Sequence, residues 1–152
     1  MAPARISNLE SHLGYWLRYV SNHVSHAFAQ KVAAHDVTVA EWVVLRELYP
    51  AADANPSEVA DKLGMTRGAI SKIAERLVAK DLVARTPSTT DRRYHSLTLT
   101  SRGKALVPRL AADADRNDKA FFGHLDNAER QALERLLRGI VRRSGLRAVP
   151  ID

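Results

Sequence analysis

A short stretch near the middle of the chain combines the residue types that bind nucleic acid. Residues 66–76 mix basic side chains with the small residues Gly68 and Ser71. Small residues let a helix enter the major groove of DNA, and neighbouring basic side chains then reach phosphates or base edges. We therefore predict a helix here with one DNA-contacting face. The predicted contacts are Thr66, Arg67, Gly68, Ser71, Lys72 and Arg76.

A second candidate contact is the polar segment 86–94, which is rich in turn-forming residues. Its two arginines, Arg92 and Arg93, are not expected to pack in the core. A narrow minor groove attracts an inserted arginine. Asp91 stands two residues before Arg93, close enough in sequence to hold its guanidinium in one orientation. The alternative is that these charges only keep the loop solvated. The residues predicted to contact DNA are Ser88, Thr89, Asp91, Arg92 and Arg93.

Ring side chains near the N-terminus form a stripe at helical spacing, four, three, four and three residues apart. They are His12, Trp16, Tyr19, His23 and His26. We expect that part of this stripe lines a pocket for an aromatic anion, together with Trp42 and Arg46 from the next helix. The alternative is that the rings pack between two copies of the chain or stay half-exposed.

A metal site is a weaker interpretation of the same stripe. His23 and His26 are three residues apart, which allows both to bind one ion, but no nearby residue completes the site. Glu41 and His35 are loose candidates, and the chain has no cysteine. We expect no metal and no cofactor, with a metal-responsive protein kept as an alternative.

The basic charge lies where the DNA contacts are predicted. The 152 residues carry a net charge of +6. Residues 66–95 hold seven Lys or Arg and three acids, which gives +4, whereas residues 1–65 hold five and seven, which gives −2. Basic charge on one compact segment is what a phosphate backbone requires of its partner.

Other classes of protein find little support in the sequence. No apolar run is long enough for a secretion signal or a membrane span, so we expect a cytoplasmic protein. We recognise no catalytic triad, no phosphate-binding glycine loop and no pair of carboxylates in a plausible pocket. An enzyme is therefore not expected.

Capping residues predict where six helices begin: Ser7, Thr38, Asn55, Thr66, Thr100 and Asp126, with Glu10 and Glu41 completing capping boxes at the first two. Together with the apolar spacing they predict about six helices and one hairpin. The predicted helices are 7–35, 38–49, 56–63, 66–80, 100–124 and one from 126 onward, with strands at 82–85 and 96–99. Helices 56–63 and 66–80 are joined by a short turn containing Gly64, the helix-turn-helix pattern. The second of them should bury Ile70, Ile73, Leu77 and Val78. An ordinary helical hairpin with a charged outer face is the alternative.

These segments resemble the MarR family of bacterial regulators over nearly the whole chain, most sharply from Ser57 to Gly103. Residues 65–72, Met-Thr-Arg-Gly-Ala-Ile-Ser-Lys, are similar to the start of the family's recognition helix. Arg85, Asp91 and Arg93 stand at the spacing of its wing. The family usually has glycine where this chain has Asp81, and aspartate adopts the left-handed conformation less readily.

The resemblance implies a mainly α (α+β) winged helix-turn-helix whose first and last helices interlock with those of a second copy. The expected regions are 1–36 and 104–152 for dimerisation and 37–103 for DNA binding. It also implies that the recognition helix faces the major groove, while Arg93 enters the minor groove with Asp91 as its brace. Related regulators bind phenolic ligands between the dimerisation helices and the winged helix.

We thus expect a sequence-specific regulator of transcription, most often a repressor in this family, that binds double-stranded DNA as a homodimer. Two-fold symmetry implies an operator with inverted half-sites about 10 bp apart or a multiple of that. A small aromatic or phenolic ligand should release it. The competing interpretations are a non-specific architectural DNA-binding protein and a winged helix used only for protein contacts.

Overall fold

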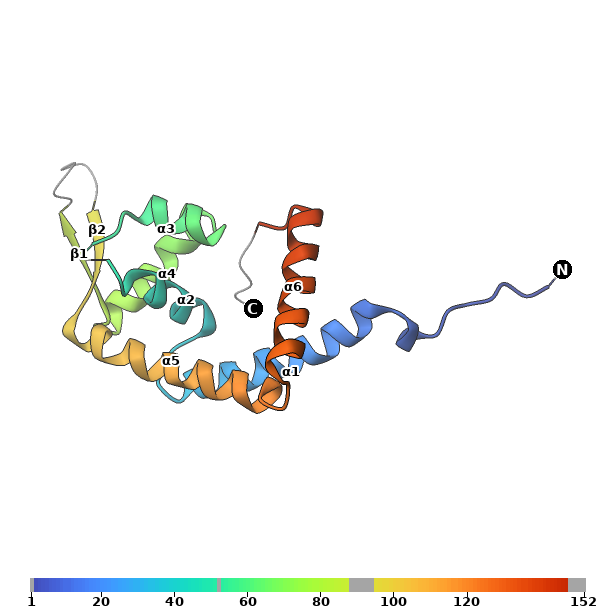
Figure 1. Cartoon of the computed structure of the whole chain (residues 1–152). Helices are drawn as coiled ribbons and strands as arrows, with labels where there is room; N and C mark the ends of the chain where they lie inside the picture. The colour runs from blue at the N-terminus through green and yellow to red at the C-terminus, as the bar shows by residue number, and fades with distance from the viewer. Residues whose placement is uncertain (1, 52, 88–94, 148–152) are drawn as a thin grey trace.

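The computed structural model describes residues 2–51, 53–87 and 95–147. In chain order the elements are a 3-10 turn, η1 (Leu9–Ser11), then α1 (Leu13–Ala33), α2 (Val39–Leu48), α3 (Pro56–Leu63), α4 (Arg67–Ala79), β1 (Val83–Pro87), β2 (His95–Leu99), α5 (Ser101–Phe122) and α6 (Asn127–Ser144). Figure 1 shows α2, α3, α4 and the hairpin gathered at one end, with α5 running beneath them toward α6. The predicted winged helix-turn-helix fold and order of elements are confirmed.

Side-chain caps fix where most of these helices begin. In each case a side-chain oxygen accepts a backbone N–H from two or three residues later, which satisfies a donor left free at the helix start. These caps are Thr38, Asn55, Thr66, Thr100 and Asp126. All five were predicted from the sequence, and Asp126 forms the full reciprocal capping box with Glu129.

The start of the first helix was predicted wrongly. Ser7 opens no helix; a 3-10 turn follows, and α1 begins only after His12, whose backbone is extended. A cap contributes only about 1 kcal/mol, and a helical turn without tertiary packing is hard to nucleate. Packing is lacking here, because Ile6 and Leu9 are 89% and 73% exposed.

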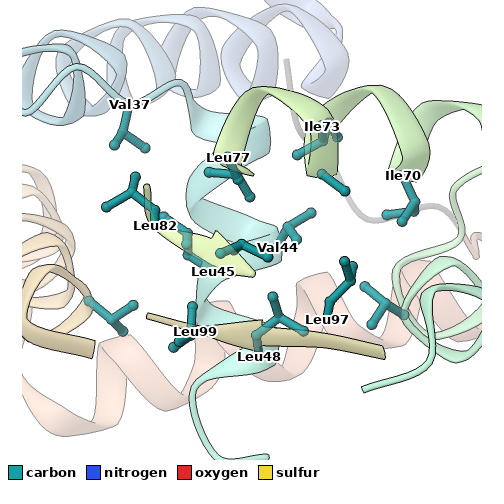
Figure 2. Close-up of a cluster of buried hydrophobic side chains, with 14 of the residues drawn as sticks. Val37, Val44, Leu45, Leu48, Ile70, Ile73, Leu77, Leu82, Leu97 and Leu99 are labelled. Carbon is teal, nitrogen blue, oxygen red and sulfur yellow. The ribbon is translucent and has the colours of Figure 1, made fainter. Parts of the chain in front are cut away.

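The core lies between the winged-helix elements and α5. Figure 2 shows Leu45 and Leu48 of α2 meeting Ile70 and Leu77 of α4 and Leu97 of β2. The two long helices reach the same cluster through Val32 of α1 and Val107 and Leu110 of α5. One continuous core therefore joins both predicted regions of the chain.

One residue predicted for the buried face of α4 lies outside it. Val78 is 40% exposed, whereas Ala74 is 2% exposed and takes part in the core. At 3.6 residues per turn, Val78 lies about 80° around the helix from Ile70, at the edge of the stripe, and Ala74 lies closer to its centre. The apolar spacing alone did not separate these two positions.

The hairpin is attached to the rest of the winged helix through the middle of β2. Strands β1 and β2 pair antiparallel from Val83–Leu99 to Pro87–His95. Strand β1 begins one residue later than predicted and ends two residues later, and β2 begins one residue earlier than predicted. The backbone of Ala54 exchanges two hydrogen bonds with Leu97, at 2.9 and 2.8 Å. This bridge fixes the hairpin to the segment that leads into α3.

A seam of polar side chains holds α1 against α5. Lys31 Nζ donates to Asn117 Oδ1 at 3.0 Å, and Asn117 Nδ2 donates to the carbonyl of Val24 at 3.1 Å. One turn away, His35 Nε2 lies 3.0 Å from the buried carboxylate of Asp113. Because buried polar groups lose free energy when left unpaired, the seam fixes the register of the two helices.

The outer helices, α1 near its start and α6, each have an apolar face that the described part of the chain does not cover. The N-terminal part of α1 projects away from the body and α6 turns away from the end of α5 (Figure 1). Their large apolar side chains are exposed, among them Leu13, Leu17, Leu136 and Ile140. None of the described helices is both long enough and apolar enough to span a membrane.

Candidate nucleic-acid interface

The helix-turn-helix is built around a three-residue turn between α3 and α4. Gly64 ends α3 in the left-handed conformation, with φ 64°, which glycine adopts without strain. The N–H of Met65 then bonds back to Ala60 O at 2.9 Å, and Thr66 caps α4 by accepting from Ala69 N at 3.1 Å. The turn thereby fixes where α4 begins and which way it points.

Helix α4 buries one face completely and exposes the other. Ile70 and Leu77 are fully buried, and Ile73 and Ala74 are nearly so. The opposite face brings together all the residues predicted on this helix, with every side chain exposed. They are Arg67, Gly68, Ser71, Lys72 and Arg76, with Thr66 at the start.

Gly68 is not required by packing inside the chain. A Cβ placed there would come no closer than 4.0 Å to any neighbouring atom, the hydroxyl oxygen of Thr66. Gly103 of α5 is the opposite case, because a Cβ there would lie 2.1 Å from the carbonyl oxygen of Leu82. Gly103 serves internal packing, whereas Gly68 leaves the start of α4 open to an outside partner.

A buried ion pair, missed in the sequence, holds the C-terminal end of α4. Glu41 of α2 is 1% exposed, and its carboxylate accepts from Lys80 Nζ at 2.9 and 3.2 Å. Arg76 Nε lies 3.9 Å from the same carboxylate, and Lys80 also donates to Asp36 O at 2.6 Å. The end of α4 is thereby tied to α2 and to the α1–α2 turn.

The sequence did contain a signal for this pair. The predicted capping box places the Glu41 side chain at the start of its own helix. Only half of that box forms: Thr38 accepts a hydrogen bond from Glu41 N, and the Glu41 carboxylate binds Lys80 instead. The carboxylate stands among apolar residues of a core helix. A buried carboxylate requires a cation, so a distant lysine or arginine was to be expected.

At the junction after α4, Asp81 occupies the position where the family usually has glycine. This residue adopts the left-handed conformation with φ 58°, and the N–H of Leu82 reaches back to Leu77 O at 3.0 Å. Thr100 then donates its hydroxyl to Asp81 O at 2.7 Å and its N–H to Leu82 O at 3.1 Å. Aspartate thus takes the conformation usually given to glycine, and the start of α5 holds it there.

The hairpin brings a further basic residue beside α4. A cleft of about 210 Å³ lies between the start of α3, α4 and the strands, with Ser71, Arg85 and His95 in its lining. Arg85 is exposed, and its position opposite Leu97 is set by the strand register. The predicted wing contacts Ser88, Thr89, Asp91, Arg92 and Arg93 lie outside the described residues.

A surface ion pair links the first helix of the motif to α2. Lys62 Nζ lies 2.7 Å from Glu47 Oε1. The hydrogen bond to this carboxylate, helped by its negative charge, raises the pKa of Lys62 above its ordinary value. Lys62 is therefore positively charged at neutral pH.

The residues predicted for a ligand pocket fall into two groups within one chain. His12 and Tyr19 line a hollow of about 500 Å³ on α1, and Trp16 donates its Nε1–H to Glu10 O at 2.9 Å. Trp42 instead packs edge-on against Phe28, with ring centroids 6.3 Å apart. Phe28 lies about 13 Å along α1 from Tyr19, since each residue adds 1.5 Å.

Two other residues accompany these groups. Arg46 of α2 is exposed. Arg18, which the sequence interpretation did not select, lines the α1 hollow beside the rings. Its cation makes this hollow better suited to an anion than the rings alone.

Two of the four residues considered for a metal have other partners. His35 lies against Asp113, and Glu41 binds Lys80. Across the described residues, no group of three or more His, Asp or Glu side chains is arranged to hold an ion.

Comparison with known proteins gives a consistent group of relatives. A model of the MarR family matches residues 35–93. The HTH-type transcriptional regulator PrsX of Escherichia coli is 31% identical over 105 residues, which cover 68% of this chain and 63% of PrsX. The chain thus spans somewhat less than two thirds of that relative.

Two solved structures share the fold over most of their length. BpsR of Bordetella bronchiseptica, whose DNA binding is regulated by 6-hydroxynicotinic acid, matches with a TM-score of 0.77 and 29% identity, covering 90% of this chain and 97% of that one. A cysteine-to-serine mutant of Escherichia coli MarR, in complex with operator DNA, matches with a TM-score of 0.76 and 26% identity, covering 85% and 93%.

Proposed function

We propose that the chain is a member of the MarR family and a sequence-specific regulator of transcription that binds double-stranded DNA as a homodimer. The observation that carries this proposal is the outer face of α4. Its basic and small side chains are all exposed, while the opposite face is anchored in the core. A helix held this firmly by one side can present the other to a groove without rearrangement.

In the proposed complex, α4 lies in the major groove. Gly68 and Ser71 allow close approach, and Arg67, Lys72 and Arg76 reach base edges or phosphates. Gly68 supports this arrangement because no described part of the chain comes close enough to require glycine there. The related MarR in complex with operator DNA supports the use of this fold on a duplex.

We propose minor-groove contacts from the segment between β1 and β2. Arg93 would enter the groove with Asp91 bracing it, and Ser88, Thr89 and Arg92 would contact the backbone. This part rests on the sequence and on the likeness to the family. Arg85, exposed on β1 beside the cleft next to α4, adds a basic group on the same side.

The proposed dimer rests on the exposed apolar faces of the outer helices. Leu9 and Leu13 near the start of α1 are 73% and 79% exposed, and Leu136 of α6 is 61% exposed. Large contiguous apolar surfaces mark interfaces, and a second copy of the chain would cover them. We propose that residues 1–36 and 104–152 form this dimerisation region, giving inverted half-sites in the operator.

We further propose that the protein is a cytoplasmic repressor, not an enzyme, released from its operator by a small aromatic or phenolic ligand. BpsR supports ligand control, since its DNA binding is regulated by 6-hydroxynicotinic acid. The proposed pocket uses His12, Trp16 and Tyr19 of α1. Trp42 and Arg46 of α2 lie apart from these rings within one chain and would join them only across the proposed dimer. Packing of the same rings between the two copies is the alternative.

The test is a DNA titration over a series of salt concentrations. An operator is first selected from a random library, and its affinity is compared with that of random DNA by fluorescence anisotropy. We expect the operator to bind about 10³-fold more tightly or better. Little preference would instead indicate architectural binding, and no binding at all would indicate a winged helix used for protein contacts.

A further inference from the structure

The cleft between the hairpin and the helix-turn-helix is small and lined by hydrogen-bond donors. Its volume of about 210 Å³ is below the range of pockets that hold small organic molecules. The polar side chains of its lining are Asn55, Ser57, Ser71, Arg85 and His95. No acidic residue of the described part of the chain is among them. A cleft of this size and charge suits a single small anionic group.

The strand register places both basic side chains on the inward face of the hairpin. Side chains alternate between the two faces of a strand, so His95 shares a face with the buried residues Leu97 and Leu99. Arg85 pairs with Leu97 across the strands and shares this face too. Arg85 and His95 are therefore diagonal neighbours, with Cβ atoms about 7 Å apart. The inward face changes from apolar to basic where it leaves the core, beside α3 and α4 (Figure 1).

Arg85 and His95 are both exposed, so neither is there to fill the core. An arginine and a protonated histidine this close repel each other. An anion bound between them would replace the repulsion with two attractive interactions, each a hydrogen bond to a charged group.

Ser71 joins the cleft to the outer face of α4. Its side chain is exposed on the face that carries Arg67 and Lys72, and it also lines the cleft. The cleft therefore opens at the edge of the surface proposed to enter the major groove. Serine hydroxyls and arginine side chains are among the groups that bind the phosphates bordering a groove.

We propose that Ser71, Arg85 and His95 bind one phosphate of the DNA backbone, and that the contact is strongest when His95 is protonated. This inference rests on the proposed function and adds His95 to the DNA contacts. The serine hydroxyl, the guanidinium and the imidazolium each donate a hydrogen bond to a phosphate oxygen. Because histidine changes charge between pH 5 and 8, operator affinity should rise as the pH falls from 8 to 6.

The other charged residues on the elements around the cleft lie outside its lining. Those described are exposed: Asp53 before α3, Glu58 on α3, and Lys72 and Glu75 on α4. Carboxylates in water are ionised from pH 6 to 8, and lysine and arginine are protonated there. Asp91, Arg92 and Arg93 lie outside the described residues and belong to the same two classes. A pH dependence in this range that requires His95 therefore reports on its imidazole.

The test is an anisotropy titration of the selected operator at pH 6, 7 and 8, at constant ionic strength. The original chain should bind about tenfold more tightly at pH 6 than at pH 8, since one charged hydrogen bond is gained in each protomer. Affinity should also fall more steeply with salt at pH 6, by a slope of about one per protomer, because one more cation meets a phosphate.

Two substitutions at the same position separate charge from shape. H95Q is neutral at every pH and should bind weakly with a flat pH profile. H95R is always charged and should bind at pH 8 about as tightly as the original chain does at pH 6. The control H124Q removes an exposed histidine beyond the end of α5 and should keep the original ratio of affinities. Thermal melts at both pH values check that each variant is folded.

The source of the phosphate is tested by adding about 10 mM inorganic phosphate at matched ionic strength. The affinity of the original chain and of H95Q should change alike, because a free ion gains none of the neighbouring DNA contacts. A loss confined to the original chain would indicate a site for free phosphate instead.

Two further results would overturn the contact: the same pH dependence in H95Q as in the original chain, or an H95R that binds as weakly as H95Q. Operator binding that does not change with pH would refute the contact and leave the proposed function standing. No operator binding at any pH would refute the proposed function, and the contact with it.

Discussion

The winged helix and the outer helices differ in what covers their apolar side chains. In the winged helix, Leu45, Ile70 and Leu97 are at most 1% exposed, each covered by other parts of the same chain. In α6, Leu136, Leu137 and Ile140 are 61%, 40% and 49% exposed, although their spacing on one helix face is just as regular. The first region is complete within one chain, and the second is half of the interface that the proposed dimer requires.

Because of this difference, mutations in the two regions should change different properties of the protein. In the winged helix, a substitution changes the free energy of unfolding of the chain itself. In α6, it should change association between chains and, through that, DNA binding.

The largest effect is expected from charges placed in the exposed face of α6. The double variant L136E/I140E should convert the dimer to a monomer, weakening association about a hundredfold or more, because two buried carboxylates would lack partners. Sedimentation equilibrium measures this directly. The control R135E makes the same change in net charge on the opposite side of α6 and should remain dimeric. A dimeric L136E/I140E would show that α6 is not the interface.

Next in size is the buried ion pair of the winged helix. Glu41→Gln should lower the free energy of unfolding by about 3 kcal/mol, because it removes the buried counter-charge of Lys80 and leaves only the exposed carboxylate of Asp36, 3.9 Å away. Chemical denaturation measures the loss, and adding Lys80→Met should recover part of it. Glu58→Gln, at an exposed position of α3, should change stability by less than about 0.5 kcal/mol. Equal effects of the two substitutions would contradict the structural role of Glu41.

Gly68→Ala should separate stability from DNA binding. The methyl group has open space in the free chain and should stabilise α4 by about 0.5–1 kcal/mol, yet it should weaken operator binding about fivefold by crowding the groove. The matched control is Gly14→Ala, also at the second position of a helix and also in open space. It should stabilise without affecting DNA. Unchanged operator affinity in Gly68→Ala would remove the argument for close approach at this position.

The smallest effect concerns the left-handed residue after α4. Asp81→Gly should raise the free energy of unfolding by up to about 1 kcal/mol, because glycine adopts the observed φ of 58° without a Cβ penalty. Asp61→Gly, inside α3, should have the opposite sign and cost about 0.3 kcal/mol. Denaturation of both variants checks the pair, and a destabilised Asp81→Gly would mean that the aspartate side chain has a role of its own.

The parts of the fold that were predicted from the sequence are those fixed by residues close together in the chain. The caps at Asn55, Thr66 and Thr100 were predicted because each bond joins residues two or three positions apart. The exposed face of α4 was predicted because its buried stripe repeats at helical spacing. The capping signal at Ser7 failed where no packing supported it, and the edge residue Val78 was misplaced because spacing alone does not say how wide the buried stripe is.

Contacts between distant residues were not predicted. Glu41 and Lys80 are 39 positions apart, and Lys31 and Asn117 are 86 apart, so no local pattern connects them. The ring stripe was recognised as a surface, but its partner depends on a second copy or a ligand. Within one chain, Trp42 packs on Phe28 instead of joining His12 and Tyr19.

The polar seam between α1 and α5 makes these two helices move together as one rigid unit. Sliding one past the other by a turn would strand the buried groups of Asn117 and Asp113, so movement is confined to joint rotation. Helix α5 is about 33 Å long, and a rotation of about 5° about one end would carry the other through about 3 Å. A displacement of that size is comparable to the spacing of successive base pairs, so a small rotation at one end could change which part of a groove the recognition helix meets.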